Sequence, residues 1–314
     1  MKESSYKNNR ILILGGTGFI GSHIVKKALF LGFNVTVICK NERSLSQAIK
    51  NVDYLLVDIS QEDKVTQLLQ NKSFHYIINL SGYVNHVDIF SGGDNVFDVH
   101  FSGIKNLIYA LNLNNLKNFI QIGSSDEYGS NVAPQTEDQR ESPISPYSLA
   151  KTSITHFLQM LYRVENFPVV ILRPFLVYGP GQGIERFIPH VINGCIEGKE
   201  FPTSEGKQLR DFCYIDDFVE AVFLAIDNNK ALGEVINIAS GQPISIRAVV
   251  KKIQKLVANG SPIFGITKYR KGENMELYAD ISKAKSLLNW QPKVKLNLGL
   301  KLTINSIYEL RNAK

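Results

Sequence analysis

The chain has 314 residues, 44% of them apolar and 20% charged, and 35 Lys and Arg against 29 Asp and Glu residues give a formal net charge of +6. This is the composition of an ordinary globular protein with one large domain or two coupled ones, and it excludes collagen-like, low-complexity and intrinsically disordered chains. The longest apolar stretches are only as long as a strand, so we expect no membrane-spanning segment.

The first predicted element is a strand that leads through a glycine-rich turn into a helix. Ile11–Leu14 is continuously apolar, as expected of a parallel strand covered on both faces, and His23–Leu29 has helical spacing. Between them stands GGTGFIG, residues 15–21. Its glycines let the backbone approach a pyrophosphate, and the following helix offers its N-terminal N–H groups to that anion. We therefore predict a dinucleotide site with contacts from Gly15, Thr17, Gly18, Phe19, Ile20 and Gly21.

Strand and helix patterns then alternate along the first half of the chain. Strands are predicted at 34–39, 53–57, 76–80 and 119–122, and helices at 61–70 and 103–111. This alternation predicts an α/β fold with a doubly wound parallel sheet, which binds ligands at the carboxyl ends of its strands. There we expect Asp58 to accept a hydrogen bond from the adenine amino group and Ser81 and Gly82 to flank the cofactor ribose. Ile59 and Leu80 are further expected cofactor contacts.

The residues after the second strand bear on the choice between NAD and NADP. An Asp or Glu at this place usually holds the 2′-hydroxyl of the adenosine ribose of NAD, whereas this chain has CKNER, residues 39–43. Lys40 and Arg43 could neutralise the 2′-phosphate of NADP, or they could be solvated loop charges. Asn41 could bind an unphosphorylated ribose, so the sequence leaves both cofactors open.

Tyr147 and Lys151 stand four residues apart at the start of an apolar-periodic helix. Side chains at this spacing share one face of a helix, and an ammonium beside a phenol favours the phenolate. Tyr147 could then take a proton from a sugar hydroxyl or return it. The loop GSSDEYG, residues 123–129, follows a predicted strand and supplies a hydroxyl that could bind the same sugar oxygen.

Five segments in chain order resemble the extended short-chain dehydrogenase/reductase family, the NAD-dependent epimerases and dehydratases that act on nucleotide sugars. They are GGTGFIG, GSSDEYG, SPYSLAK, LRPFLVYGPG and EGKQLRDFCYIDD. The resemblance runs from about residue 10 to 310 and implies Ser124, Tyr147 and Lys151 as catalytic residues, with Ser125 as the neighbour that could be confused with Ser124. It also implies a Rossmann domain over 1–180, re-entered at about 210–240, and a nucleotide-sugar-binding lobe over 181–314.

The resemblance further implies binding residues for cofactor and substrate. Arg210 and Arg270 match family positions that hold the diphosphate, a role that suits planar guanidinium groups. An ion pair with a neighbour such as Asp211 or Glu273 is the structural alternative for these arginines. Tyr147, Lys151 and Pro174 are expected to contact the cofactor, and Ser124, Ser125, Asp126 and Arg186 the substrate.

The residues after Ser124 help to separate epimerisation, 4,6-dehydration and net redox at C4. Dehydratases carry an acidic pair directly after the catalytic hydroxyl, in a form like STDEVYG or STSELYG. The aligned residues of this chain are Ser125 and Asp126, so the first acid is missing and the second is shortened from Glu to Asp. Shortening a Glu to Asp moves the carboxylate by more than about 1 Å, which can cost about a hundredfold in rate. The form GSSDEYG is closest to the GSSEEYG-type loop of reductases acting on GDP-4-keto-6-deoxymannose.

Two departures from the family indicate an altered substrate pocket. His100 and Leu176 stand where the family commonly has Asn. His100 could titrate during catalysis, although a structural histidine is the favoured interpretation. We predict hydride transfer at C4, by a 4-keto reductase or 4-dehydrogenase, with a 4-epimerase as the alternative and a 4,6-dehydratase as a weaker one. A catalytically idle nucleotide-sensing or RNA-binding protein is the alternative of another class, and the complete set of catalytic residues argues against it.

The last expectations concern partners and location. Cys39, Cys195 and Cys213 are widely spaced, which indicates buried or inert thiols in a reducing cytosol and no metal site. The N-terminus is polar and unlike a signal peptide, so we expect a cytoplasmic enzyme, and the dispersed lysines indicate no nucleic-acid partner. Besides a nucleotide-diphosphate sugar, the resemblance implies a homodimer that packs helices 103–111 and 148–163 into a four-helix bundle. The apolar residues of the second helix, Ile154, Phe157, Leu158 and Leu161, could equally face the protein's own sheet.

Overall fold

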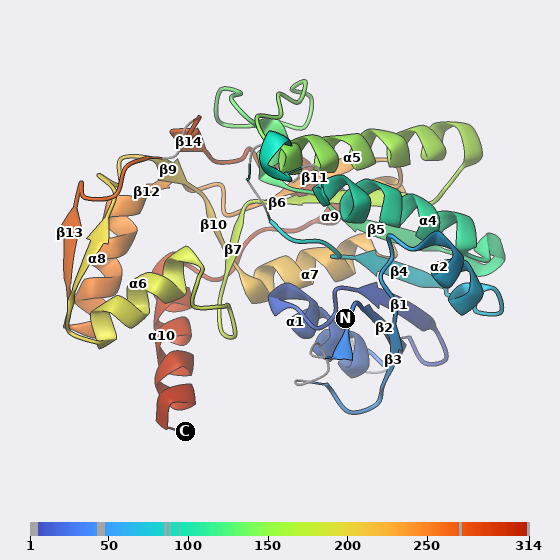
Figure 1. Ribbon diagram of the computed structural model, residues 1–314, viewed down its shortest axis with the longest axis horizontal. Helices are drawn as coiled ribbons and strands as arrows, with labels where there is room; N and C mark the ends of the chain where they lie inside the picture. Colours follow the sequence, from blue (N-terminus) through green and yellow to red (C-terminus); the bar gives the residue numbers. More distant parts are fainter. Residues whose placement is uncertain are drawn as a thin grey trace. The chain divides into compact units, whose positions relative to one another are not determined.

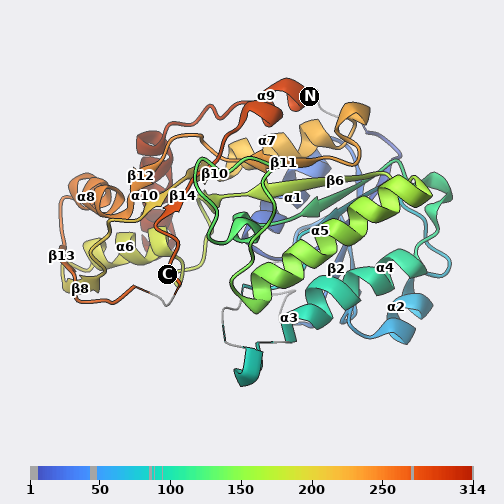
Figure 2. The ribbon, with the colours of Figure 1, turned by 90° about the horizontal axis from the view of Figure 1, so that it is seen from above.

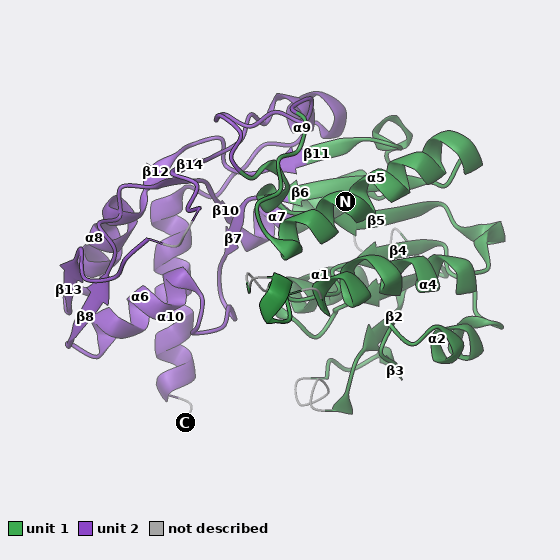
Figure 3. Ribbon diagram, turned by 45° about the horizontal axis from the view of Figure 1, so that its top comes forward, with its two compact units in different colours: residues 1–129, 140–173, 219–236 green, residues 130–139, 174–218, 237–314 purple. Residues whose placement is uncertain are grey.

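The computed structural model describes residues 6–42, 48–84, 87, 89–93, 95–269 and 272–312. The chain forms two compact units (Figure 3): unit 1 contains 1–129, 140–173 and 219–236, and unit 2 contains 130–139, 174–218 and 237–314. The predicted Rossmann domain, 1–180 with re-entry at about 210–240, extends beyond unit 1 at 130–139, 174–180, 210–218 and 237–240. Gln135 accounts for the first difference, because its side-chain amide hydrogen-bonds to Glu276 and Tyr278 within unit 2.

A seven-stranded sheet forms the centre of unit 1 (Figure 1), with the strand order β11-β6-β5-β4-β1-β2-β3. Its strands are β1 (Arg10–Leu14), β2 (Asn34–Cys39), β3 (Val52–Leu56), β4 (Tyr76–Asn79), β5 (Asn118–Ile122), β6 (Val169–Pro174) and β11 (Val235–Ile238). Strands β1 to β6 pair in parallel. The predicted doubly wound α/β fold is confirmed, and each predicted strand lies within one residue of its observed bounds.

Helices cover both faces of this sheet, which explains why its central strands are buried and largely apolar. Figure 2 shows α2, α4 and α5 on one face and α1 and α7 on the other. The core on the first of these faces joins Leu12 and Phe119 of the sheet to Leu107 and Ile154 of the helices. The helices are α1 (Phe19–Phe30), α2 (Glu62–Leu69), α3 (Asn95–Phe97), α4 (Gly103–Ala110), α5 (Pro146–Glu165) and α7 (Ile215–Ala225). Helix α7 belongs to unit 1 only from Val219 on.

The apolar residues of α5 that were candidates for a dimer contact face the protein's own sheet. Ile154 and Leu158 are fully buried, and Phe157 and Leu161 are partly buried against the same core. Ile154 and Leu158 therefore follow the second alternative and belong to the protein's own core, while Phe157 and Leu161 keep part of their surface exposed. Large apolar side chains that are exposed on α4 and α5 are instead Tyr109, Leu149, Met160 and Val164.

Unit 2 is built from short strand pairs and helices. Strand β7 pairs in parallel with β10, β9 lies between β12 and β14, and β8 pairs in parallel with β13. The strands are β7 (Leu176–Tyr178), β8 (Glu200–Thr203), β9 (Leu209–Arg210), β10 (Phe212–Tyr214), β12 (Ile244–Ser245), β13 (Ser261–Phe264) and β14 (Glu276–Leu277). The helices are α6 (Phe187–Ile196), α8 (Ile246–Val257), α9 (Ser282–Leu288) and α10 (Leu296–Asn312).

Three further findings complete the description of the fold. The three cysteines are buried free thiols, as predicted. Within the described ranges, no group of three or more His, Cys, Asp or Glu side chains could hold a metal ion. None of the helices described here combines the length and the apolar character needed to cross a membrane.

Candidate active site

The glycine turn after β1 brings its backbone close to the neighbouring strand end. Gly15 has a φ of +74°, and a Cβ there would lie 2.8 Å from the carbonyl oxygen of Leu80. Gly18 is the N-cap of α1, and no side chain forms a capping hydrogen bond at the N-terminus of this helix. The predicted contacts at Thr17, Phe19 and Ile20 thus stand at a helix N-terminus suited to an anion. These residues fit the pyrophosphate of a dinucleotide.

Gly21→Ala is expected to lower the free energy of unfolding by about 2 kcal/mol or more, because overpacking between two backbones has little room to relax. A Cβ at Gly21 would lie 2.1 Å from the carbonyl oxygen of Gly15 and 2.7 Å from the Cα of Gly16. Gly18→Ala is the matched control, since its nearest neighbour would be 3.4 Å away. Urea unfolding of both variants checks this; equal midpoints would contradict the tight packing at Gly21.

The ends of β2 and β3 join two predicted cofactor residues in an ion pair. The Lys40 Nζ lies 2.9 Å from an Asp58 carboxylate oxygen, and Asp58 also accepts hydrogen bonds from the amide and hydroxyl of Ser60. Burial opposes the charge of Asp58, but Lys40 and Ser60 outweigh it and lower the pKa of this carboxyl. Asn41 is exposed beside this pair, and Arg43 lies outside the described residues.

The end of β4 places the other expected cofactor contacts beside the glycine turn. The Ser81 amide and hydroxyl donate to the Asn79 side chain at 3.0 and 2.6 Å, which fixes the chain as it leaves the strand. Gly82 has a φ of +110°, and a Cβ there would lie 1.9 Å from the ring of His100. Ile59 is buried and packs against Gly103. Leu80, Ser81 and Gly82 therefore share one sheet edge with Gly15.

Helix α5 begins where its sequence predicts. Ser145 is the N-cap, with its hydroxyl accepting from the Ser148 amide at 3.1 Å, and Pro146 occupies the first turn. Tyr147 and Lys151 are both buried on this helix, 6% and 5% exposed. The Lys151 Nζ donates to the carbonyl oxygen of Ile122 at 2.9 Å. Burial lowers the pKa of Lys151 to about 8, while the negative charge of Glu127 opposes this shift.

His100 lies against the predicted catalytic tyrosine. It stands in the π-helical turn Asp98–Ser102 before α4, and its ring centroid is 5.3 Å from that of Tyr147. The Nε2 atom is 3.0 Å from the carbonyl oxygen of Tyr83. Burial and the charge of Lys151 lower the pKa of His100 to about 3. The ring is therefore neutral at physiological pH, which favours the structural interpretation over a titrating one.

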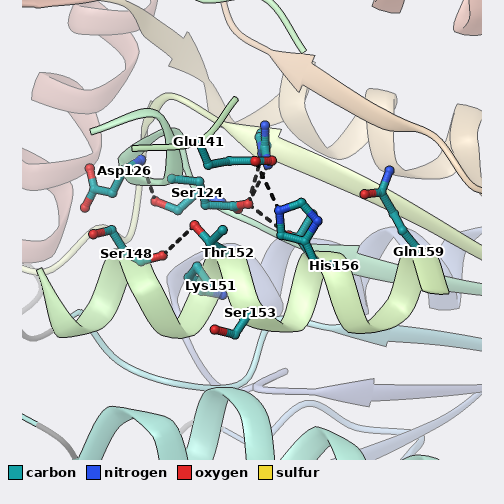
Figure 4. A network of polar contacts seen from close by, with 12 residues as sticks. Ser124, Asp126, Glu141, Ser148, Lys151, Thr152, Ser153, His156 and Gln159 are labelled. Atoms are coloured by element: carbon teal, nitrogen blue, oxygen red, sulfur yellow. Dashed lines mark hydrogen bonds and ion pairs between the residues drawn. The ribbon is translucent and has the colours of Figure 1, made fainter. Parts of the chain in front are cut away.

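Ser124 lies where β5 gives way to the short 3₁₀ helix η5 (Ser125–Tyr128), of which it is the N-cap. Its hydroxyl oxygen accepts from the Asp126 amide at 3.1 Å. Ser125 is buried and Asp126 is half-buried. Figure 4 shows Ser124 facing α5, the helix that carries Lys151. The structure thus brings the predicted serine loop and the Tyr–Lys helix together within unit 1.

A buried charge network under this loop was not foreseen. Arg173 of β6 donates from Nε and Nη2 to Glu127, at 3.0 and 2.8 Å, and also pairs with Glu141. Glu141 in turn lies 3.1 Å from His156 of α5 (Figure 4). Burial opposes the charge on Arg173, but Glu127, Tyr128 and Glu141 outweigh it and raise the pKa of the guanidinium. An arginine inside the apolar segment VVILRP was the signal that a buried acid must lie nearby.

Two of the predicted substrate arginines, Arg186 and Arg210, lie in unit 2. Arg210 of β9 is 8% exposed and forms an ion pair with Glu273, which is the structural alternative that the sequence left open. Arg186 is exposed at the N-cap of α6, and Arg270 lies outside the described residues. Pro174 and Leu176 are half-buried at the end of β6 and in β7.

A parallel sheet with a glycine turn after its first strand, a buried Tyr–Lys pair and a serine loop define a dinucleotide-dependent enzyme. Residues 11–239 match the model of the NAD dependent epimerase/dehydratase family. The chain belongs to this family and is an NAD-dependent enzyme that modifies nucleotide sugars.

Three similar proteins illustrate the range of the family. The UDP-N-acetyl-alpha-D-glucosaminuronate decarboxylase of Bacillus cytotoxicus is 30% identical, over 96% of this chain and 99% of that one. The structure of UDP-glucose 4-epimerase from Thermotoga maritima with UDP-glucose is 27% identical, with a TM-score of 0.88 over 96% and 99% of the two chains. The UDP-glucuronic acid 4-epimerase of Bacillus cereus, in complex with UDP-glucuronic acid and NAD, is 28% identical over the same shares, with a TM-score of 0.83.

Proposed function

We propose that this enzyme transfers a hydride at C4 of the sugar of a nucleotide-diphosphate sugar, as a 4-keto reductase or 4-dehydrogenase in activated-sugar biosynthesis. The observation that carries the proposal is the buried pair of Tyr147 and Lys151 on α5, beside the loop of Ser124. Bound NAD would accept the hydride when a 4-hydroxyl is oxidised, and bound NADH would donate it when a 4-ketone is reduced. The loop form GSSDEYG supports the reductase direction, since it is closest to the GSSEEYG-type loop.

In this proposal each of the three residues has one task. Tyr147 takes the proton from the 4-hydroxyl or returns it to the 4-ketone. Lys151 is mostly an ammonium at neutral pH, because its pKa is about 8, and its charge favours the phenolate of Tyr147. Ser124 donates or accepts a hydrogen bond at the same sugar oxygen, so that the C4–O bond is held while the hydride moves.

The proposed cofactor is NAD rather than NADP. Of the two basic residues predicted to bind a 2′-phosphate, Lys40 is the one that the structure describes. Its Nζ atom forms an ion pair with the Asp58 carboxylate at 2.9 Å. The bound NAD in the related epimerase structure supports the same choice. The negative charge of Asp58 beside Lys40 also opposes the binding of a 2′-phosphate there.

A nucleotide-sugar 4-epimerase is the second candidate. The similarity to UDP-glucose 4-epimerase favours it, because it extends over 96% of this chain and 99% of that one. An epimerase takes the hydride from C4 and returns it to the other face within one turnover, so its cofactor stays bound. A reductase must exchange its cofactor at each turnover.

Incubation of the purified enzyme with a panel of nucleotide sugars tests the proposal. The panel contains UDP-glucose, UDP-galactose, UDP-glucuronic acid and GDP-4-keto-6-deoxymannose, each with added NAD or NADH and followed at the absorbance of reduced nicotinamide. We expect stoichiometric cofactor oxidation or reduction with one of these sugars. Conversion without any net change in added cofactor would establish the epimerase if the product is an isomer of the substrate, or the 4,6-dehydratase if the product has lost water, and no turnover with any sugar would refute the C4 assignment.

Asp126→Asn is expected to leave C4 redox chemistry largely in place, within about threefold, because this reaction abstracts no proton at C5. Dehydration would need a carboxylate base at this place and would lose about 10²-fold or more. Turnover in deuterated solvent gives an independent measurement by mass spectrometry. We expect no solvent deuterium at C5 or C6 of the product. Efficient labelling at C6, together with lost activity in Asp126→Asn, would establish the 4,6-dehydratase instead.

We further propose that the enzyme is a cytoplasmic homodimer. The exposed apolar side chains of Tyr109 on α4 and of Leu149, Met160 and Val164 on α5 support an intersubunit contact at these helices. The contact would be formed by these exposed residues, since Ile154 and Leu158 belong to the protein's own core.

A further inference from the structure

Glu127 is a buried charge that the proposed reaction does not itself use. Its side chain and that of its partner Arg173 are both 0% exposed. Buried charges are unfavourable unless they are fully paired and hydrogen-bonded.

One carboxylate oxygen of Glu127 holds the backbone of Ser124. The Ser124 amide donates to Glu127 Oε1 at 2.8 Å, and the Glu127 amide donates back to the Ser124 carbonyl oxygen at 3.1 Å. A Cβ at Gly123 would lie 2.5 Å from the same Oε1 atom. The carboxylate therefore fills the space directly beneath the loop, and Ser124 is held at both its amide and its carbonyl group.

The other carboxylate oxygen holds the rest of the site. The Thr155 hydroxyl donates to Glu127 Oε2 at 2.9 Å, and Arg173 donates to it from Nε and Nη2. Thr155 lies one helical turn after Lys151 on α5. Hydrogen bonds to an ionised group are short and directional. A single side chain thus connects the Ser124 loop to the helix that carries the Tyr–Lys pair.

We infer that Glu127 is a positioning residue, which holds Ser124 at a fixed place relative to the Tyr147 and Lys151 helix, with Arg173 as its counter-ion. The inference rests on the proposed function, in which the Ser124 hydroxyl binds the reacting sugar oxygen. A hydroxyl displaced by about 1 Å from such a place can cost about a hundredfold in rate. A rigid support under the loop prevents that displacement.

The double variant Glu127→Val/Arg173→Met tests the inference by removing both members of the fully buried ion pair together, and Glu141 keeps its contact with His156. The probe is UDP-glucose, or the sugar that gives the strongest signal in the panel above. We expect kcat to fall about 10–100-fold and KM to change by less than about threefold, with the unfolding midpoint near that of the wild type. Glu141→Gln is the matched control, because Glu141 contacts Arg173 but makes no hydrogen bond to Ser124; its kcat should stay within about twofold.

The double variant Glu127→Val/Arg173→Met, made also in a Ser124→Ala background, shows whether Glu127 acts by positioning Ser124 or by a general structural role. If Glu127 acts through the serine hydroxyl, its loss should lower kcat by less than about twofold once that hydroxyl is gone. Equal losses in both backgrounds would overturn the inference. Wild-type turnover in Ser124→Ala would refute the assignment of Ser124, and with it the inference. Lost turnover in Ser124→Ala beside full turnover in the double variant would overturn the inference alone.

Amide hydrogen exchange at Ser124, followed by NMR, gives a measurement that needs no substrate. We expect slow exchange in the wild type and in Glu141→Gln, and exchange at least about tenfold faster in the double variant, because the amide loses its buried acceptor. Glu127→Met, which keeps about the length of the side chain but removes both acceptor oxygens and leaves Arg173 paired with Glu141, serves in its place if the double variant does not fold. Unchanged protection in the folded variant would overturn the inference.

Discussion

Tyr147→Phe is expected to abolish measurable turnover and to leave nucleotide-sugar binding nearly intact. The substitution removes one hydroxyl and keeps the ring, so the contact with His100 at 5.3 Å is retained. Loss of a general acid–base group costs about 10²–10⁴ in rate. The measurement is kcat with the sugar selected by the panel, together with the dissociation constant of the same sugar by calorimetry.

Tyr162→Phe is the matched control for this experiment. Tyr162 is on the same helix and is partly buried against the core of the sheet, but it stands about four turns further along. Its loss of a hydroxyl should change kcat by less than about twofold. A Tyr147→Phe enzyme that keeps turnover within a few-fold of the wild type would remove Tyr147 from the mechanism.

The fold was predictable because its strongest constraints are local. A strand buried on both faces is largely apolar, and Ile11–Leu14 and Val169–Leu172 satisfy this without interruption. The turn after β1 needs glycines, because any Cβ at Gly21 would strike the backbone of Gly15. Both requirements leave marks within a few residues of sequence. The alternation of such segments with helices then restricts the topology to a doubly wound sheet.

The charge network under the Ser124 loop was not predictable in the same way. Glu127 and Arg173 are 46 residues apart, and nothing in the sequence states that two distant charges are partners. Lys40 and Asp58 illustrate the same difficulty, since the sequence assigned them to different parts of the cofactor. They stand after β2 and β3, which pair in parallel, so their proximity follows from the sheet order. Pairing of charges depends on three-dimensional contacts that periodicity does not encode.

Lys151→Met is expected to inactivate the enzyme and at the same time to stabilise the cofactor-free protein at pH 7. Burial lowers the pKa of Lys151 from 10.5 to about 8, which corresponds to a cost of about 3 kcal/mol for keeping the ammonium in the folded state. Methionine has a similar length and no charge to desolvate. The Ile122 carbonyl oxygen keeps a donor, since the Gln121 side-chain amide also bonds to it at 3.0 Å. We therefore expect a gain of about 1–3 kcal/mol in the free energy of unfolding.

The sign of the pH dependence distinguishes this explanation from improved packing. Because the folded-state pKa of Lys151 is lowered, the unfolded chain binds more protons than the folded protein between pH 8 and 10.5. The contribution of Lys151 to the free energy of unfolding of the wild type therefore rises with pH in that window. The advantage of Lys151→Met should be full below about pH 8 and vanish toward pH 10.5. Urea unfolding of cofactor-free protein measures it, since bound NAD would stabilise the two proteins unequally. Lys64→Met, at an exposed lysine of α2, removes a charge that is not buried and should show no gain at pH 7. A constant advantage of Lys151→Met at every pH would assign the gain to packing instead of to the buried charge.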